Sequence, residues 1–411
     1  MDVLLLCGYF EPKYQEEITR KTKTWVENAA NTFQQRLIAG LREQEINLKV
    51  VSAPFIGPWP RAYTDKTFKG FEAGESAENV QYVHFNNIWG YRNISRTAVL
   101  KRCVKDFIKN SKAEKKAIIV YCPHTPFLEA AVYGKELDNS VHIHMVVPDL
   151  PQYMNLSKKA HPIYDFFKKI DIQKMEKLIA QVDSFMLLTK YMADKLHVGN
   201  RPYIVVEGIT DTKNIPPKKK ERGKKIAYAG KLVEAFGAKR LVEAFEMIDD
   251  SEASLHICGG GELKPYVEEM CQKDSRIHYY GVVPAEKANE ILQNADVLVN
   301  PRQNDDEYTK YSFPSKNIEY LMTGNVVVAY MLDGIPKEYA SFFYVPKSNQ
   351  TESLTEAMRE AMNESSVERA QKNKMIRDYI ENHCGALSVA KQIVDVIDLL
   401  IKVKSQNKKI R

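Results

Sequence analysis

Short apolar runs alternate with amphipathic segments along this chain, and that alternation is the feature that most constrains its fold. A strand, a helix and a further strand in succession are typical of a parallel sheet covered by helices. The first half of the chain is therefore predicted to be an α/β domain. Its expected strands are Asp2–Cys7, Leu48–Ser52, Val80–Phe85, Ala117–Tyr121, Val141–Val147 and Ser184–Leu188, with helices at Ala29–Leu41 and Arg96–Ile108.

The alternation is interrupted at Asp211–Lys225, where the chain is polar, basic and carries paired prolines. We interpret this segment as a linker, because the pattern restarts after it and predicts two Rossmann-like parallel-sheet domains facing across a cleft. The predicted boundaries are 1–205, 206–385 and, for a terminal helix, 386–411. The expected strands of the second domain are Lys225–Ala229, Ser254–Cys258, Ile277–Tyr280, Asp296–Asn300, Val326–Tyr330 and Phe342–Val345, with helices at Ala238–Ile248, Glu262–Gln272, Glu286–Gln293, Pro314–Thr323 and Leu354–Asn363.

The most informative stretch of the second half is the run EYTKYSFPSKNIEYLMTG, residues 307–324. Phe313 and Pro314 are typical of a loop that turns into a helix, since proline is tolerated in a first helical turn. Ser312 and Ser315 are candidate caps for the free N–H groups at that end. The exposed face near the helix start is expected to carry Lys316 and, three residues on, Glu319.

A capped helix N-terminus with a lysine is suited to binding an anion, because free N–H groups and the helix dipole both attract negative charge. A carboxylate one turn further along can accept hydrogen bonds from two hydroxyls of a sugar. Phosphate next to ribose describes a nucleotide, so Lys316 and Glu319 are candidate nucleotide contacts. The same residues also fit an ordinary surface helix with an ion pair, and both interpretations stay open from this segment alone.

The pattern SFPSK-x-x-EY-x-x-x-G before an apolar strand resembles the nucleotide-sugar motif of family 4 glycosyltransferases, a bacterial polysaccharide and capsule type with the two-domain GT-B fold. The resemblance implies that the loop Ser312–Ser315 binds the donor diphosphate and that Glu319 holds the ribose. Tyr311 stands where the family has a glutamate that contacts the donor sugar. The resemblance also implies transfer with retention of configuration, a UDP-sugar as the commonest donor, and a terminal helix that packs back on the first domain.

Loops at other strand ends add candidate donor contacts, because ligands of open α/β sheets bind beyond the carboxyl ends of strands. Lys231 is a candidate to stabilise the leaving diphosphate as a point charge; the family usually has arginine there and a lysine where this chain has Phe236. The alternative for Lys231 is a solvated lysine. The glycines after the second strand have two equal interpretations, close approach to a ligand or a simple turn of the chain. The remaining candidates are Gly230, Gly260, Val282, Val283 and Arg302, of which the two valines occupy the family's base-contacting segment.

The first half offers three candidates at strand ends: Gly8, His124 and Asp149. Gly8 stands in the first loop, where the family often has two glycines. His124 either faces the acceptor or packs its proline-flanked loop. Asp149 stands where the family commonly has a His-Asp pair and is expected to face the cleft, with a role toward the acceptor or the donor sugar. His142 and His144 share a strand face but lack a third ligand, so they are expected to be buried rather than to bind a metal.

Charge and cysteine content narrow the function classes. The six cysteines lie far apart, which argues against a disulfide framework or a zinc site, and the acidic doublets do not form an Asp-x-Asp metal clamp. No metal and no cofactor other than the nucleotide sugar as co-substrate are expected. The net charge of +6 is concentrated in two basic clusters, which suit anionic headgroups or phosphorylated acceptors, or form solvated faces. They are Lys158-Lys159, Lys168-Lys169, Lys174 and Lys177 on one predicted helix, and Pro217–Lys225 in the linker.

The resemblance to family 4 implies a hexosyltransferase that moves a sugar from a nucleotide sugar to a glycan or lipid-linked acceptor of cell-surface polysaccharide synthesis. No nucleic-acid motif accompanies the basic clusters, and no apolar run has the roughly 20 residues of a membrane span. A cytoplasmic location is therefore expected, with peripheral contact to the anionic inner face of the plasma membrane. Two alternatives remain: a non-catalytic sugar-nucleotide-binding partner subunit, and another GT-B enzyme such as a sugar-nucleotide epimerase.

Overall fold

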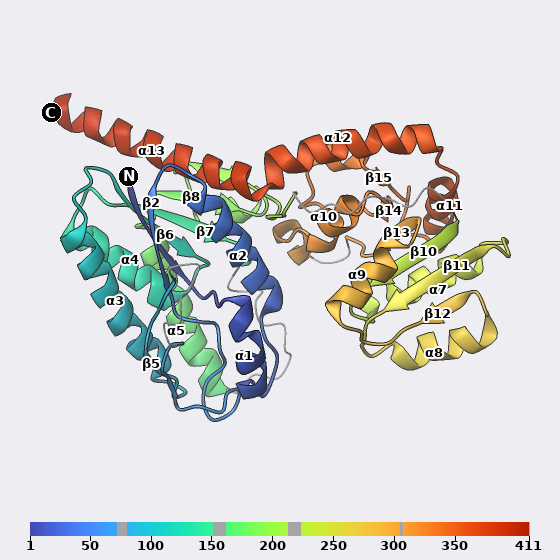
Figure 1. Ribbon diagram of the computed structural model, residues 1–411, viewed down its shortest axis with the longest axis horizontal. Helices are drawn as coiled ribbons and strands as arrows, with labels where there is room; N and C mark the ends of the chain where they lie inside the picture. Colours follow the sequence, from blue (N-terminus) through green and yellow to red (C-terminus); the bar gives the residue numbers. More distant parts are fainter. Residues whose placement is uncertain (72–79, 151–161, 213–222, 305–306, 411) are drawn as a thin grey trace. The chain divides into compact units, whose positions relative to one another are not determined.

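The computed structural model describes residues 1–71, 80–150, 162–212, 223–304 and 307–410 (Figure 1). The chain divides into two compact units, hereafter unit 1 and unit 2. Unit 1 comprises Met1–Ile209 and His383–Arg411, and unit 2 comprises Thr210–Asn382. Each unit has its own parallel sheet flanked by helices, which confirms the predicted pair of Rossmann-like α/β domains.

The sheet of unit 1 has the strand order β4-β2-β1-β6-β7-β8-β9, and all its pairs are parallel. Its strands are β1 (Asp2–Cys7), β2 (Asn47–Ser52), β4 (Val80–Tyr82), β6 (Lys116–Tyr121), β7 (His142–Val147), β8 (Ser184–Leu187) and β9 (Tyr203–Val205); a small antiparallel pair is formed by β3 (Thr67–Phe68) and β5 (Phe85–Asn86). Its helices are α1 (Gln15–Lys21), α2 (Asn28–Arg42), α3 (Arg92–Asn110), α4 (Thr125–Leu137), α5 (Pro162–Ile179), α6 (Met192–Lys195) and α13 (Ala386–Ile410). A 3-10 turn at Pro12–Tyr14 precedes α1.

The sheet of unit 2 has the order β12-β11-β10-β13-β14-β15, again parallel throughout. Its strands are β10 (Lys224–Ala229), β11 (Ala253–Cys258), β12 (Ile277–Tyr279), β13 (Val297–Asn300), β14 (Val326–Ala329) and β15 (Phe343–Tyr344). Its helices are α7 (Ala238–Glu246), α8 (Lys264–Lys273), α9 (Ala285–Gln293), α10 (Ser315–Met322), α11 (Thr351–Met362) and most of α12 (Ser366–Cys384), with 3-10 turns at Glu234–Phe236, Glu307–Tyr311 and Lys337–Ser341.

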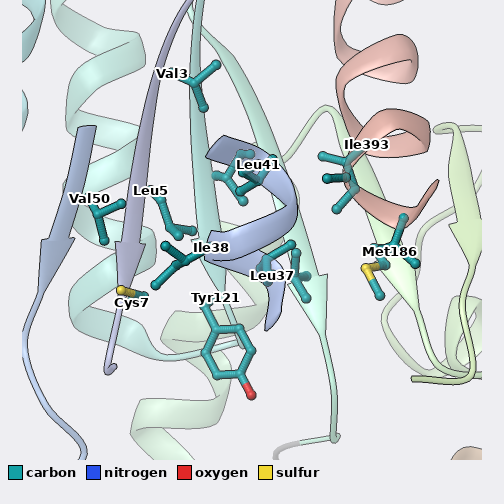
Figure 2. Close-up of a cluster of buried hydrophobic side chains, with 14 of the residues drawn as sticks. Val3, Leu5, Cys7, Leu37, Ile38, Leu41, Val50, Tyr121, Met186 and Ile393 are labelled. Atoms are coloured by element: carbon teal, nitrogen blue, oxygen red, sulfur yellow. The ribbon is translucent and has the colours of Figure 1, made fainter. Parts of the chain in front are cut away.

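The core of unit 1 lies between one face of its sheet and the helices α2 and α13. Figure 2 shows Leu37, Ile38 and Leu41 of α2 packed over strand residues such as Leu5, with Ile393 of α13 beside them. These side chains are at most 1% exposed. The apolar faces of α2 and α13, which are far apart in the sequence, therefore pack into the same core. Helix α13 is part of unit 1.

One expectation about secondary structure is wrong, and some elements were missed. The predicted strand Val80–Phe85 is divided, because its ladder with β2 ends at Tyr82 and Phe85 turns away to pack on Phe68 of β3, with ring centroids 5.2 Å apart. The prediction missed the helices α1 and α12 and the edge strand β9. Helix α12 has no marked apolar stripe, and β9 is short and partly exposed. Most of the predicted linker, 213–222, lies outside the described residues, and Lys224 and Lys225 already belong to β10.

The two histidines of β7 are buried, as predicted. The Oγ atom of Ser184 lies 2.8 Å from both His142 Nε2 and His144 Nδ1. All six cysteines are free thiols. No helix within the described ranges combines the length and the apolar character needed to cross a bilayer.

Candidate functional site

The loops at the carboxyl edge of the unit 2 sheet are joined by backbone hydrogen bonds. The N–H of Gly230, after β10, donates to the carbonyl of Cys258 at 2.9 Å, and the N–H of Gly259, after β11, donates to Gly281 at 2.8 Å. A Cβ atom on Gly260 would lie 2.9 Å from Cγ2 of Val282. The structure thus brings the predicted candidates Gly230, Gly260 and Val282 together at one edge.

Gly259 is the glycine that this arrangement requires. Its φ of +134° lies in a region that L side chains rarely adopt, and a Cβ atom there would fall against the carbonyl oxygen of Gly230. Both the backbone conformation of Gly259 and the close approach of the two loops therefore require a residue without a side chain.

We expect Gly259→Ala to destabilise unit 2 by roughly 2–4 kcal/mol, since backbone strain and a backbone clash add. Gly281→Ala is the matched control, because Gly281 also has a positive φ, +69°, but no atom within 4 Å of the added Cβ. That change should cost only about 1 kcal/mol. Urea unfolding followed by far-UV circular dichroism measures both, and equal losses would contradict the close-approach argument.

The helix α10 begins one residue later than predicted, and the predicted serine caps are not formed. Pro314 is the N-cap residue and no side chain caps the helix. Ser315 is exposed, while the Oγ of Ser312 is buried and has no hydrogen-bond partner among the described residues. Ser312 does not cap the helix because it lies two residues before Pro314, outside the first turn. Within the part of the chain that the structure describes, no side chain caps the N-terminal amides of α10.

Lys316 does not lie on the exposed face, contrary to the prediction, whereas Glu319 does. The Nζ atom of Lys316 lies 4.9 Å from the centroid of the Tyr228 ring, and a Cβ atom on Gly230 would fall against it. The pKa of Lys316 is lowered to about 8, chiefly because its ammonium is removed from water; Glu319 opposes this shift, and the charges of Arg302 and Lys231 add to it. Lysine, arginine and carboxylate are therefore within electrostatic reach of one another.

Arg302, in the loop after β13, is held between two aromatic rings. Its guanidinium carbon lies 5.3 Å from the centroid of Phe236 and 4.7 Å from that of Tyr308. Its Nε and Nη2 atoms are buried and have no hydrogen-bond partner in the part of the chain that the structure describes. Stacking fixes the plane of the guanidinium and leaves two donors available for a bidentate interaction with an oxyanion.

The unpartnered polar groups of this edge are donors or can donate. Among the described residues they are Nε and Nη2 of Arg302, Oγ of Ser312 and Nδ2 of Asn317, whose Oδ1 accepts a hydrogen bond from Asn300 at 2.7 Å. The ammonium of Lys316 lies within electrostatic reach of Arg302. The amides of the α10 N-terminus add partial positive charge. Concentrated donors and cations suit an anion with several oxygens, such as a phosphate or diphosphate. The exposed carboxylate of Glu319 is available to accept hydroxyls beside it.

The remaining predicted residues of unit 2 differ in exposure. Lys231 and Val282 are exposed, the latter at 82%, and Val283 is half-buried. Phe313 is buried, with its ring centroid 5.2 Å from that of Tyr339, so its side chain packs the loop against the core.

The three candidates of unit 1 follow its strands β1, β6 and β7. Gly8 is buried under the ring of Phe55, and its N–H donates to Gln34 Oε1 at 2.7 Å. His124 is half-buried beside the same ring, 5.7 Å between centroids, and its Nδ1 has no partner among the residues described. Burial, together with the positive charges of Arg96 and Arg92, keeps the pKa of His124 well below its usual value.

Asp149 is exposed, unlike Gly8. The chain packed around its carboxyl group nevertheless disfavours the ionised form and raises its pKa to about 6, and the charge of Glu27 acts in the same direction. A carboxyl group with such a pKa can exchange a proton near neutral pH.

Sequence reasoning missed the residues that position the cations. Tyr228 lies under Lys316, while Phe236 and Tyr308 hold Arg302. These contacts join separate loops, so no spacing in the sequence indicates them. The one available signal was Phe236 itself, an aromatic residue at a position where the resembled family has a lysine.

Parts of other predictions lie outside the described residues. They are Lys158 and Lys159 of the basic helix, the doublet Asp305-Asp306 and the basic linker up to residue 222. Within the described ranges, no group of three or more histidine, cysteine, aspartate or glutamate side chains is placed to hold a metal ion.

Known proteins resemble the chain in fold. Sucrose-phosphate synthase from Thermosynechococcus elongatus is 14% identical with a TM-score of 0.60, over 98% of this chain and 100% of that one. Anabaena HepE in complex with UDP-glucose is 10% identical with a TM-score of 0.56, over 97% and 99%. A mutant of S. aureus TarM in complex with fondaparinux, α-GlcNAc-glycerol and UDP is 14% identical with a TM-score of 0.50 over 77% of this chain, which spans only 60% of its length.

No curated protein matches the chain at the level of sequence. Residues 210–408 match the family model described as glycosyl transferases group 1. This range contains the loops and the helix α10 that carry the donors and cations described above. The chain thus has the two-domain GT-B fold, and its residues 210–408 match the family model of glycosyl transferases group 1.

Proposed function

We propose that this protein transfers a hexosyl group from a UDP-sugar to a glycan or lipid-linked acceptor. The observation that carries the proposal is a set of donors and cations at the carboxyl edge of the unit 2 sheet. It comprises Lys316, the α10 N-terminus and the Arg302 guanidinium, whose Nε and Nη2 have no partner among the described residues. Such a set is suited to the diphosphate of a nucleotide sugar, and the match to the glycosyl transferases group 1 model supports that use.

The chemistry follows from where charge develops. As the bond between the sugar and the diphosphate breaks, negative charge grows on the leaving oxygen. Donors fixed in advance stabilise that charge without having to reorient. Arg302 is fixed by two rings and Lys316 by Tyr228, so both meet this condition. We assign the ribose hydroxyls to Glu319, which is exposed beside Lys316.

UDP as the donor nucleotide is supported by two structures of the same fold, TarM with UDP and HepE with UDP-glucose. Retention of configuration rests on the motif around Glu319 and its resemblance to family 4. We place the acceptor at the strand ends of unit 1, where His124 and Asp149 lie. The proposed setting is cell-surface polysaccharide synthesis at the cytoplasmic face of the plasma membrane.

One observation favours a second candidate, a subunit that binds the sugar nucleotide without turning it over. Tyr311 stands where the resembled family has a glutamate that contacts the donor sugar, and its hydroxyl lies 3.3 Å from Glu307 Oε1. An assay of UDP release from UDP-hexoses with and without acceptor glycans separates the two. Tight binding with no release in any condition would favour the subunit.

The test of the site is a thermal-shift screen against UDP, GDP, ADP and their sugars, repeated with Glu319→Ala. UDP at a hundred times its dissociation constant should add about 2.7 kcal/mol to stability. Loss of the Glu319 carboxylate should weaken UDP binding by roughly 1–3 kcal/mol, since a hydrogen bond to a charged group is lost. Glu356→Ala, at an exposed glutamate of α11, should bind UDP like the wild type. Unchanged affinity in Glu319→Ala would remove this helix from the nucleotide site.

A further inference from the structure

The chain has three tryptophans, Trp25, Trp59 and Trp89, and all lie in one region of unit 1. Trp25 is 71% exposed and Trp89 50%, while Trp59 is half-buried. Two further apolar side chains extend the exposed surface at the start of α3, Tyr91 at 47% and Ile94 at 62%. We call Trp25, Trp89, Tyr91, Ile94 and the neighbouring Arg61 the aromatic patch. Large exposed apolar groups gathered in this way indicate an interaction surface.

Backbone hydrogen bonds hold the three segments of the patch side by side. The N–H of Lys23 donates to the carbonyl of Ala62 at 3.0 Å, and the Lys23 ammonium donates to Pro60 at 3.0 Å. The N–H of Trp89 donates to the carbonyl of Trp59 at 3.1 Å. Helix α1 and strand β5, which adjoin these segments, lie at the same end of unit 1 (Figure 1). The patch is therefore a built surface rather than separate loose loops.

Two exposed basic side chains lie beside the patch, together with the acidic residues Glu27 and Asp65, each of which has a partner of its own. The guanidinium carbon of Arg61 lies 5.9 Å from the centroid of the Trp89 ring, and both side chains are exposed. Lys23 is exposed at the edge next to Trp25. Glu27 accepts a hydrogen bond from the Trp25 indole at 2.7 Å. Tryptophan and tyrosine with arginine and lysine are the residues that hold a protein at the headgroup level of a bilayer.

We propose that the aromatic patch docks unit 1 on an anionic lipid bilayer. Trp25, Trp89 and Tyr91 enter the headgroup region, Ile94 reaches the acyl boundary, and Arg61 and Lys23 pair with lipid phosphates. Ile94 distinguishes this occupant from a glycan, because an exposed isoleucine gains nothing from sugar hydroxyls but gains free energy when buried in hydrocarbon. The proposal does not depend on the proposed transferase activity, and its residues are different from the basic residues of α5.

Intrinsic fluorescence tests the proposal directly, since no tryptophan lies outside this region. The full-length protein is titrated with vesicles of phosphatidylcholine and phosphatidylglycerol, and separately with phosphatidylcholine alone. We expect a blue shift of tryptophan emission and co-sedimentation with the anionic vesicles. Brominated lipid should quench the emission. Binding to phosphatidylcholine alone should be weaker, because the basic side chains then lack a net counter-charge.

Two matched variants locate the contact. Ile94→Ser, at a residue 62% exposed on α3, should weaken vesicle binding on the order of tenfold. Leu399→Ser, at a residue 60% exposed on α13 of the same unit, should leave it unchanged. Arg61→Ser should weaken binding to anionic vesicles more than binding to neutral ones.

Three results would overturn the proposal. The first is the absence of both a blue shift and co-sedimentation with anionic vesicles. The second is vesicle binding that survives Ile94→Ser but is lost on substitution of Lys174 and Lys177, which would place the contact on α5. The third is a blue shift produced by soluble glycans while vesicles produce none, which would make the patch a glycan platform.

Discussion

Lys316→Met should make unit 2 more stable without ligand and should weaken its binding of UDP. The pKa of Lys316 is lowered from 10.5 to about 8 because its ammonium is removed from water beside Tyr228. A shift of one pKa unit corresponds to about 1.4 kcal/mol, so the charged lysine costs unit 2 up to about 3 kcal/mol. Methionine has a similar length and no charge, and it should recover much of that cost. Loss of the cation should lower UDP affinity on the order of tenfold to a hundredfold.

The pH dependence gives this prediction a definite sign. Below about pH 8 the lysine is protonated in both the folded and the unfolded chain, and the full cost is present. As the pH rises from about 8 toward 10.5, the folded state releases the proton first, so the unfolded chain binds more protons and the stability of unit 2 rises. The stability advantage of Lys316→Met should therefore shrink across this window.

Urea unfolding followed by circular dichroism and titration with UDP measure the two effects. Lys264→Met is the control, because Lys264 is exposed and paired with Glu268 at 3.5 Å on α8. Lys264→Met should change neither the free energy of unfolding nor the free energy of UDP binding by more than about 0.5 kcal/mol. A variant Lys316→Met that is less stable than the wild type would show that the ammonium is well compensated in the free protein. Wild-type UDP affinity in that variant would exclude Lys316 from the nucleotide site.

Unit 1 should lose stability steeply as the pH falls from about 6.5 to 4. Burial lowers the pKa of His142 to about 4 and that of His144 to about 3, from an ordinary value of 6.5. The unfolded chain therefore takes up two protons in this range that the folded chain does not bind. Each contributes about 1.4 kcal/mol per pH unit, so the pair lowers the free energy of unfolding by roughly 2.7 kcal/mol per pH unit. Asp149 acts in the opposite direction, because its folded pKa is raised to about 6.

The variant His142→Gln with His144→Gln isolates this contribution, since amide side chains do not titrate but can still form a hydrogen bond with Ser184. Urea unfolding followed by tryptophan emission reports on unit 1 alone, because the three tryptophans all lie in it. The difference in slope between wild type and variant should approach 2.7 kcal/mol per pH unit. Parallel curves for the two proteins would mean that the histidines are already charged in the folded state.

The periodicity of apolar residues in the sequence was sufficient to predict most of the fold. Apolar runs such as Asp2–Cys7 and Val326–Tyr330 correspond to β1 and β14, because strands buried on both faces of a parallel sheet are nearly continuous in apolar residues. Where the prediction was wrong, the local pattern was weak or tertiary packing overrode it. The run Val80–Phe85 divides because Phe85 gains more by packing on Phe68 than by continuing the ladder with β2.

For the candidate site, the sequence by itself determined which segments carry its residues, and the tertiary structure decided which of their side chains lie together. The run from Ser312 to Glu319 was identifiable because an anion-binding helix start needs local residue types at local spacing. The burial of Lys316 against Tyr228 and Gly230, and the stacking of Arg302 between Phe236 and Tyr308, join residues from separate loops. Such contacts depend on the order of strands in the sheet, which brings distant loops to one edge, so they became visible only in the folded chain.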